Sequence, residues 1–227
     1  MEKITSILIV CLLCITATVS AQFTNSSSSN VSQSSDVNGW FGIRVSYSPM
    51  TIDFDDEDKD MTGLSFGFVK AFPISSQTPI FAEIGANFQY FNSTILDEKD
   101  EDYGEALKMD FKMYSINVPI NIGYKYAINE TFSIFPYVGI SARGNISGKV
   151  TGSYAYDDEE ESYDINVFDK DDMDDEVFKR LQIGWQIGCG VNFNFLYLSA
   201  SYGGDFNKIA KNVELASAPS ITLGVNF

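Results

Sequence analysis

The sequence contains no histidine in its 227 residues. Histidine is the commonest general acid or base of enzymes and the commonest metal ligand. Acyl-transfer and hydrolytic sites generally need an imidazole to activate a serine or a water molecule. We therefore expect a non-enzymatic protein with no catalytic residues, no cofactor and no dedicated metal centre.

Basic residues and cysteines are also scarce. The 15 Lys and Arg residues are outnumbered by 31 Asp and Glu, and the formal net charge is −16. Such a chain repels nucleic-acid phosphates, so no nucleic-acid partner is expected. Of the three cysteines, Cys11 and Cys14 lie in an N-terminal apolar segment, and only Cys189 lies beyond it. Removal of that segment would leave no pair of cysteines to form an intramolecular disulfide.

The N-terminal apolar segment has the features of an export signal. A positive charge at Lys3 precedes the apolar run Ile4–Val19, and Val19 and Ala21 occupy the small-residue positions of a cleavage site. This order predicts a secretory signal peptide at residues 1–21. A transmembrane anchor is disfavoured because the run is short and no charge cluster follows it. Residues 22–38 are rich in Ser and Asn and are expected to form a flexible lead-in.

After Gly39 the dominant pattern is alternation with a period of two. Within one run, for example, Ile116, Val118 and Ile120 alternate with Asn117 and Pro119. Alternation of this kind predicts strands with one apolar and one polar face. Eight such runs are present, at residues 39–47, 62–72, 79–91, 111–126, 131–144, 179–193, 195–203 and 219–227.

Two architectures fit eight alternating strands. A soluble barrel or sandwich places the apolar face inside, whereas a membrane barrel places it towards lipid. The polar faces here carry Gly, Asn, Gln and Ser rather than the Lys and Glu of a soluble surface. Residues 39–227 are therefore predicted to form an all-β, eight-stranded, antiparallel, up-and-down transmembrane β-barrel in the cell outer membrane.

Short and long connections alternate along the chain. The long ones, at Ser48–Met61, Asn92–Asp110, Asn145–Phe178 and Gly204–Ala218, contain 27 of the 31 acidic residues. Outer-membrane barrels have short periplasmic turns and long extracellular loops. We therefore expect four long acidic extracellular loops and both chain termini in the periplasm.

Several short segments carry a family resemblance. Ile116–Tyr126 reads I-N-V-P-I-N-I-G-Y-K-Y, and Pro136–Ile140 reads P-Y-V-G-I. Gln186–Val191 reads Q-I-G-C-G-V, and Leu198–Gly203 reads L-S-A-S-Y-G. These segments resemble the outer-membrane beta-barrel domain family common in Bacteroidetes, often described as porin-family or PorT-like proteins. The resemblance covers about residues 39–227 and implies the fold, but it brings no catalytic residues. Ser201 stands where that family usually has an arginine.

The C-terminal segment resembles the signal that the barrel assembly machinery reads. It combines an internal glycine with alternating apolar residues and a terminal phenylalanine, in Leu223, Gly224, Val225 and Phe227. The resemblance implies the assembly machinery as a partner. The barrel itself is expected to contact outer-membrane lipid and lipopolysaccharide.

Four charged residues are predicted to point into the lumen: Arg44, Glu83, Arg143 and Arg180. They could form a selectivity filter or a buried polar network. An eight-stranded barrel has an interior just wide enough for side chains, which favours the network. Glu83 is expected to pair with at least one arginine, because an unpaired buried charge is costly.

The acidic loops leave the function open. Closely spaced carboxylates, as in Asp53–Asp60, Asp157–Glu161 and Asp169–Glu176, could bind divalent cations weakly, although the glycine of the EF-hand turn is missing. The favoured function is a structural or surface-interaction role with a side-chain-filled lumen. A narrow porin-like channel for small solutes, and adhesion or ligand binding through the loops, are the alternatives.

Overall fold

The computed structural model describes residues 38–54, 57–75, 77–100, 105–156, 159–169, 178–210 and 213–227. The expected signal peptide at 1–21, and the lead-in apart from Asn38, lie outside these ranges. Eight strands form the wall: β1 (Phe41–Phe54), β2 (Glu57–Pro73), β3 (Ile80–Asp100), β4 (Glu105–Tyr124), β6 (Phe132–Tyr156), β8 (Leu181–Phe193), β9 (Leu196–Asp205) and β11 (Ala218–Asn226). Three shorter strands accompany them: β5 (Tyr126–Ala127), β7 (Glu159–Asn166) and β10 (Val213–Leu215).

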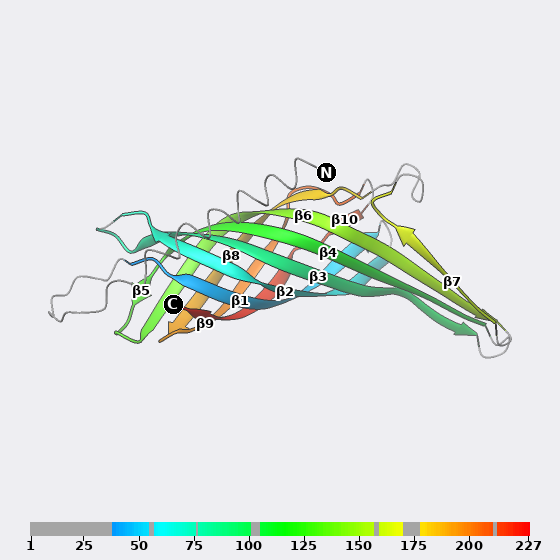
Figure 1. Ribbon diagram of the computed structural model, residues 1–227, viewed down its shortest axis with the longest axis horizontal. Helices are drawn as coiled ribbons and strands as arrows, with labels where there is room; N and C mark the ends of the chain where they lie inside the picture. Colours follow the sequence, from blue (N-terminus) through cyan, green and yellow to red (C-terminus); the bar gives the residue numbers. More distant parts are fainter. Residues whose placement is uncertain are drawn as a thin grey trace. The chain divides into compact units, whose positions relative to one another are not determined.

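The wall strands pair in sequence order and close on themselves (Figure 1). All the pairs are antiparallel, and β1 pairs with β2 on one side and with β11 on the other. Ile43, for example, faces Phe68 of β2 and Val225 of β11. The expected eight-stranded antiparallel barrel is thus confirmed.

The alternation of side chains places the apolar face outside. Ile120 and Ile187 are exposed on the outer surface, at 43% and 55% of their full accessibility. Asn121, next to Ile120, is buried on the inner side, and so is Gly190, at an inward position of the strand that carries Ile187. An outward apolar band around a polar interior is the arrangement of a membrane barrel. Among the described residues, no helix is long and apolar enough to span a membrane.

This orientation predicts the effect of charge on the outer face. We expect Ile120→Arg or Ile187→Arg to prevent stable assembly, because an arginine near the bilayer midplane costs roughly 2–4 kcal/mol. The amount of folded barrel in isolated outer membranes measures the effect, and Ile120→Val and Ile187→Val serve as controls. Wild-type levels of both arginine variants would show that this face does not contact lipid.

Three of the four expected loops are largely strand. β3 and β4 stay paired as far as Asp100 and Glu105, and β6 pairs with β4 as far as Tyr156. Within Ser48–Met61 the strand pairing continues to Phe54 and Glu57. The physical reason is that apolar residues continue to alternate past the predicted strand ends, as Met50 and Ile52 do in β1, and pack in the interior. In Figure 1 the β3, β4 and β6 ribbons run on past the ends of β1 and β2, with β7 paired to β6.

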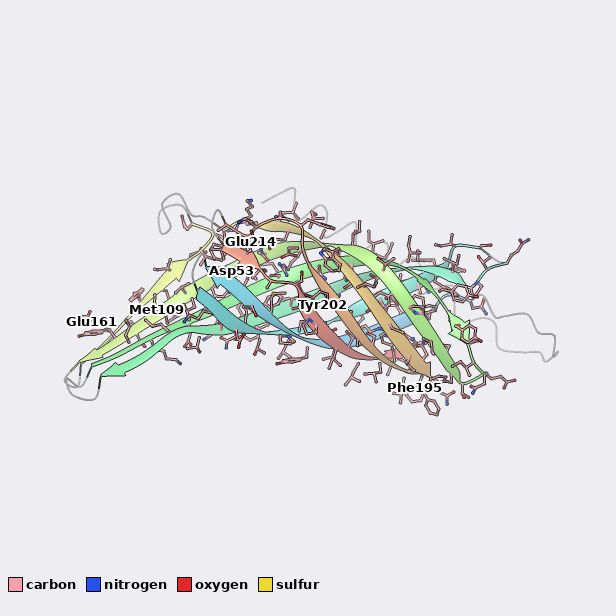
Figure 2. The ribbon with its side chains drawn as sticks, turned by 180° about the vertical axis from the view of Figure 1, so that it is seen from behind. Asp53, Met109, Glu161, Phe195, Tyr202 and Glu214 are labelled. Carbon is pink, nitrogen blue, oxygen red and sulfur yellow. The ribbon has the colours of Figure 1, made fainter. Side chains whose placement is uncertain are left out.

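Two apolar clusters occupy the inside of the barrel. We call the end that holds the paired residues Phe41 and Phe227 the proximal end and the opposite end the distal end. Figure 2 places Phe195 at the proximal end and Met109 and Glu161 towards the distal end. The proximal cluster consists of Trp40, Ala71, Phe81 and Phe135, with Tyr137 packed against it. The distal cluster consists of Ile52, Met61, Phe91, Phe111, Met113, Val167, Phe168, Phe178, Ile209, Ala210, Val213 and Leu215.

Candidate functional site: the barrel lumen

The inward side chains of several wall strands pass from the proximal cluster, through a polar middle section, to the distal cluster. Trp40, directly before β1, belongs to the proximal cluster. On β1, Arg44 and Ser46 line the polar middle section, and Ile52 belongs to the distal cluster. β4 runs in the opposite direction and passes from Met113 to buried Asn121. The lumen is therefore a polar section between two apolar clusters.

Arg44 and Glu83 form the proximal charged pair. Arg44 Nη2 lies 3.7 Å from Glu83 Oε2, and both side chains are about 5–6% exposed. Trp40 Nε1 and Asn121 Nδ2 also donate to the Glu83 carboxylate, at 3.3 and 3.4 Å. The guanidinium of Arg44 lies 3.9 Å from the ring centre of Tyr197. The buried charges are thus both paired and hydrogen-bonded, which a low-dielectric interior requires.

Backbone and amide groups complete the shell around Arg44. Its Nη1 donates to the Val225 carbonyl at 3.1 Å, and its Nη2 donates to Asn226 Oδ1 at 2.6 Å. Gly224 lies directly beside the side chain: a Cβ at this position would come within 2.8 Å of Arg44 Cδ and 2.3 Å of the Ile43 carbonyl oxygen. The glycine of the C-terminal segment therefore leaves space for the guanidinium.

The other residues of the expected assembly signal lie on the outer side. Leu223 and Phe227 are exposed, and Val225 is half-buried. These three share one face of β11 and its end, opposite Gly224. Such a face is accessible to lipid or to another protein.

Arg143 and Asp205 form a second charged pair nearer the distal cluster. Arg143 Nη2 donates to Asp205 Oδ2, and the two side chains are 7% and 12% exposed. The same nitrogen lies 3.3 Å from Gln182 Oε1, and the guanidinium lies 5.5 Å from the ring centre of Phe91. The positive charges of two arginines and the negative charges of two carboxylates therefore cancel within the lumen.

The sequence pattern places Asp205 in the loop Gly204–Ala218, so it does not predict an inward carboxylate at this position. β9 continues to Asp205, and its inward positions repeat every second residue from Tyr197 through Ser199 and Ser201 to Gly203, where the predicted strand ends. Continuing that parity by one more step would have identified the carboxylate as inward.

The prediction for Arg180 is wrong. Its side chain is exposed, its Nη1 donates to the Ile146 carbonyl at 3.0 Å, and its guanidinium lies 4.7 Å from the ring centre of Phe168. β8 begins only at Leu181, and the interior at this level is filled by the distal cluster. A guanidinium pointing inward there would lose its hydration without gaining a carboxylate, so it lies at the surface.

A polar cavity of about 150 Å³ lies between the two charged pairs. Hydroxyl and amide side chains dominate its lining, including Ser46, Asn87, Gln89, Asn117 and Ser199. Three buried polar atoms at or beside it have no hydrogen-bond partner among the described residues: Gln89 Oε1, Arg143 Nε and Gln182 Nε2. We call this cavity the chamber.

The structure bears on the cation hypothesis only in part. Within the described ranges, no group of three or more acidic or cysteine side chains is placed to hold a metal ion. Residues 55–56, 157–158 and 170–177, which contain much of the three acidic runs, lie outside those ranges. Cys189 is a free, exposed cysteine.

A family model described as "Outer membrane protein beta-barrel domain" matches residues 16–209 of the chain. The chain belongs to this family. It is accordingly an outer-membrane protein, as its outward apolar face indicates. No curated protein matches it.

Several β-barrels of known structure resemble this protein. One is Ail, the attachment invasion locus protein of Yersinia pestis, in complex with the heparin analogue sucrose octasulfate. It is 14% identical, has a TM-score of 0.44, and the match covers 84% of this chain and 99% of Ail. Neisserial surface protein A is also 14% identical, with a TM-score of 0.40 and coverage of 82% and 95%. The N-terminal barrel of Pseudomonas aeruginosa OprF is 9% identical, with a TM-score of 0.32 and coverage of 84% and 100%.

Proposed function

We propose that the protein is a closed, non-enzymatic outer-membrane barrel that acts through its surface and does not conduct solutes. The observation that carries this proposal is the pair of apolar clusters at the two ends of the lumen. The resemblance of Ile116–Tyr126 and Pro136–Ile140 also supports a place among the porin-family or PorT-like barrels of Bacteroidetes. In that case the porin label describes shape rather than open diffusion.

Both clusters are tightly filled. Phe81 and Phe135 at the proximal end, and Phe91 and Met113 at the distal end, are 0–1% exposed. An ion crossing the lumen would lose its hydration in two successive apolar layers. The arginines do not offset that cost, because Arg44 and Arg143 are already paired with carboxylates. The lumen therefore suits a structural network better than a filter.

The distal ribbon is the surface that we propose for interaction. We use this name for the paired outer parts of β3, β4, β6 and β7 (Figure 1). Its charged face holds Lys149 and Asp164, with 3.4 Å between Nζ and Oδ2. The Thr151 hydroxyl, followed by the Lys149 ammonium, holds the pKa of Asp164 below its ordinary value. The carboxylate therefore stays charged as the pH falls towards that value, beside lipopolysaccharide and its cations.

Adhesion or ligand binding through the distal ribbon is the second candidate. The observation that favours it is a pair of exposed aromatic residues, Tyr154 and Tyr163, on neighbouring strands. Exposed aromatic side chains are enriched at contact surfaces between proteins. This role is compatible with a closed lumen, whereas a porin-like channel is not.

Conductance of the purified protein in planar bilayers distinguishes the closed barrel from the channel. We expect no stable conductance steps at concentrations where a general diffusion porin in the same bilayer gives many. The amount of folded protein in the bilayer-forming vesicles is measured in parallel. This control distinguishes an inserted barrel that does not conduct from one that has failed to insert. Large, stable, anion-selective steps would contradict the proposal and would make Arg44 and Arg143 a filter.

A further inference from the structure

The seam where β11 meets β1 contains an interruption. The Cα partners of β1 and β11 run from Gly42 and Asn226 to Tyr47 and Ile221. Beyond them β1 pairs with β10, starting at Ile52 and Leu215. Ser48 Oγ donates to Ser220 Oγ at 2.8 Å, so the first register extends one residue further. The next position in that register places Pro49 opposite Pro219.

The two prolines remove both hydrogen bonds from the same rung. Phe41 and Phe227 exchange backbone hydrogen bonds, at 3.1 and 2.8 Å. In an antiparallel ladder such exchanging pairs recur at every second residue. Pro49 and Pro219 fall on this series, and proline has no N–H to donate. The N–H groups missing from both strands therefore face each other across the seam.

The ladder resumes with a shifted register. Three residues of β1, but four of the facing chain, separate Ser48 and Ser220 from Ile52 and Leu215. The Ala216 N–H donates to the Thr51 carbonyl at 2.9 Å on the far side of the interruption. The extra residue makes a bulge between β10 and β11, and a bulge locally disrupts the ladder beside the prolines.

Another wall proline lacks this effect. Pro119 interrupts the β3–β4 ladder, whose Cα partners pass from Ile84 and Ile120 to Asn87 and Asn117. It faces Gly85, whose N–H remains, and a Cβ at position 85 would come within 3.0 Å of the proline ring. Backbone and ring thus fill that break, whereas the β1–β11 seam lacks both donors.

The chamber extends to the interrupted seam. Its lining includes Ser48 and Met50 from β1, and Ala218 and Ser220 from β11. On the outside, Tyr47 and Ile221 flank the interruption and are exposed at 46% and 56%. Pro219 pairs with Tyr202, a second exposed aromatic residue. Exposed tyrosines of this kind mark the headgroup level of a membrane. A polar cavity and an apolar outer surface therefore adjoin at the interruption.

We propose that this interruption is a lateral portal through which the polar head of a membrane amphiphile enters the chamber, while its acyl tail stays on the outer face. The apolar flanks at Tyr47 and Ile221 suit a tail, which a free polar solute does not have. A cavity of about 150 Å³ is below the ~300–1,000 Å³ of pockets that bury a whole drug-sized ligand. It therefore accommodates a head but not a tail.

The chamber also defines the chemistry of the head. Its two charged pairs balance internally, so it offers no net charge to an anionic or cationic group. It offers hydroxyl and amide groups, an unpartnered acceptor at Gln89 Oε1, and an unpartnered donor at Arg143 Nε. Gln182 Nε2 is a further unpartnered donor beside Arg143. An uncharged head with several hydroxyl groups both donates and accepts hydrogen bonds and fits this set.

The test uses the full mature protein folded in phosphatidylcholine vesicles. The probe is a monoacylglycerol that carries a photoactivatable diazirine on its glycerol head. A diazirine-bearing glycerol without the acyl chain is the matched control, because it reports entry from water. After illumination, mass spectrometry locates the labelled peptides. We expect the acylated probe to label lumenal positions of β1, β9 and β11, and the tail-free probe to label them at least tenfold less.

Variants then test the seam itself. Pro49→Val combined with Pro219→Val returns both N–H donors and should reduce lumenal labelling at least tenfold. Pro136→Val, at an exposed wall position of β6 away from the seam, should leave it unchanged. A second variant joins Ser48→Cys to Ser220→Cys in a Cys189→Ala background. Its oxidised form should lose labelling, and its reduced form should keep it.

Each other outcome would overturn the proposal. Equal labelling by both probes would mean that small solutes enter from water. Labelling that survives in both the proline variant and the oxidised cysteine variant would place the entrance elsewhere, and absence of lumenal labelling would exclude entry. The result is independent of the conductance measurement, because a lateral portal needs no passage through the two apolar clusters.

Discussion

Replacing Arg143 with methionine is expected to destabilise the barrel by roughly 3–5 kcal/mol. The substitution leaves the Asp205 carboxylate, 12% exposed in the wild type, without its ion-pair partner. An isolated buried carboxylate is penalised by the full loss of hydration, which the arginine now offsets. Urea titration of the protein in lipid vesicles, followed by the mobility of folded and unfolded forms on gels, measures the free energy of unfolding.

The double variant Arg143→Met with Asp205→Leu removes both charges. It separates the free-energy cost of an unpaired carboxylate from the net stabilisation by the ion pair. Replacing a buried ion pair by apolar groups of similar size is often neutral or stabilising, so most of the loss should be recovered. Lys108→Met is the matched surface control. Lys108 lies 3.0 Å from Asp110, with side chains 49% and 24% exposed, and such pairs contribute about 0–1 kcal/mol. A loss in the double variant equal to that in Arg143→Met would contradict this explanation.

The wall could be predicted from the sequence because lipid imposes a strict rule on every strand. Ile120 and Ile187 face outward and Glu83 faces inward, as a period of two requires wherever one face contacts hydrocarbon. Beyond the membrane that rule is relaxed. Acidic residues in the outer parts of β1 to β7 therefore suggest loops, although Ile52, Ile95 and Val150 in those parts belong to or pack against the distal cluster.

The lumen was less predictable, because its contacts join residues from distant strands. The alternation of inward and outward positions predicts that Arg44 and Glu83 point inward. The pairing of Arg143 with Asp205, however, depends on β9 being long enough to include Asp205. Arg180 shows the opposite limit: parity at the end of a strand fails where the interior is already filled by apolar rings. The seam depends on register, since Pro49 and Pro219 come to one rung only when the β1–β11 register is extended past Tyr47 and Ile221.

Truncating Phe135 to alanine is the second change with a large expected effect. Its side chain is fully buried, and its ring packs edge-on against Trp40 with 5.4 Å between centres. Removing a buried phenylalanine side chain typically costs about 3–5 kcal/mol, because the cavity left behind collapses only in part. Phe193→Ala, on the exposed outer face of β8, should cost less because lipid can fill the space.

Gly123 provides an internal check on that interpretation. A Cβ at position 123 would lie 2.5 Å from Phe135 Cζ, so Gly123→Ala should overpack the proximal cluster at a cost of about 1–3 kcal/mol. In the Phe135→Ala background the ring is gone, and the added methyl group partly fills the cavity. The two substitutions should therefore be non-additive by at least about 0.5 kcal/mol, as for residues in direct contact. Strict additivity in urea titrations would show that the ring does not rest on Gly123, and that the proximal cluster does not close the lumen as described.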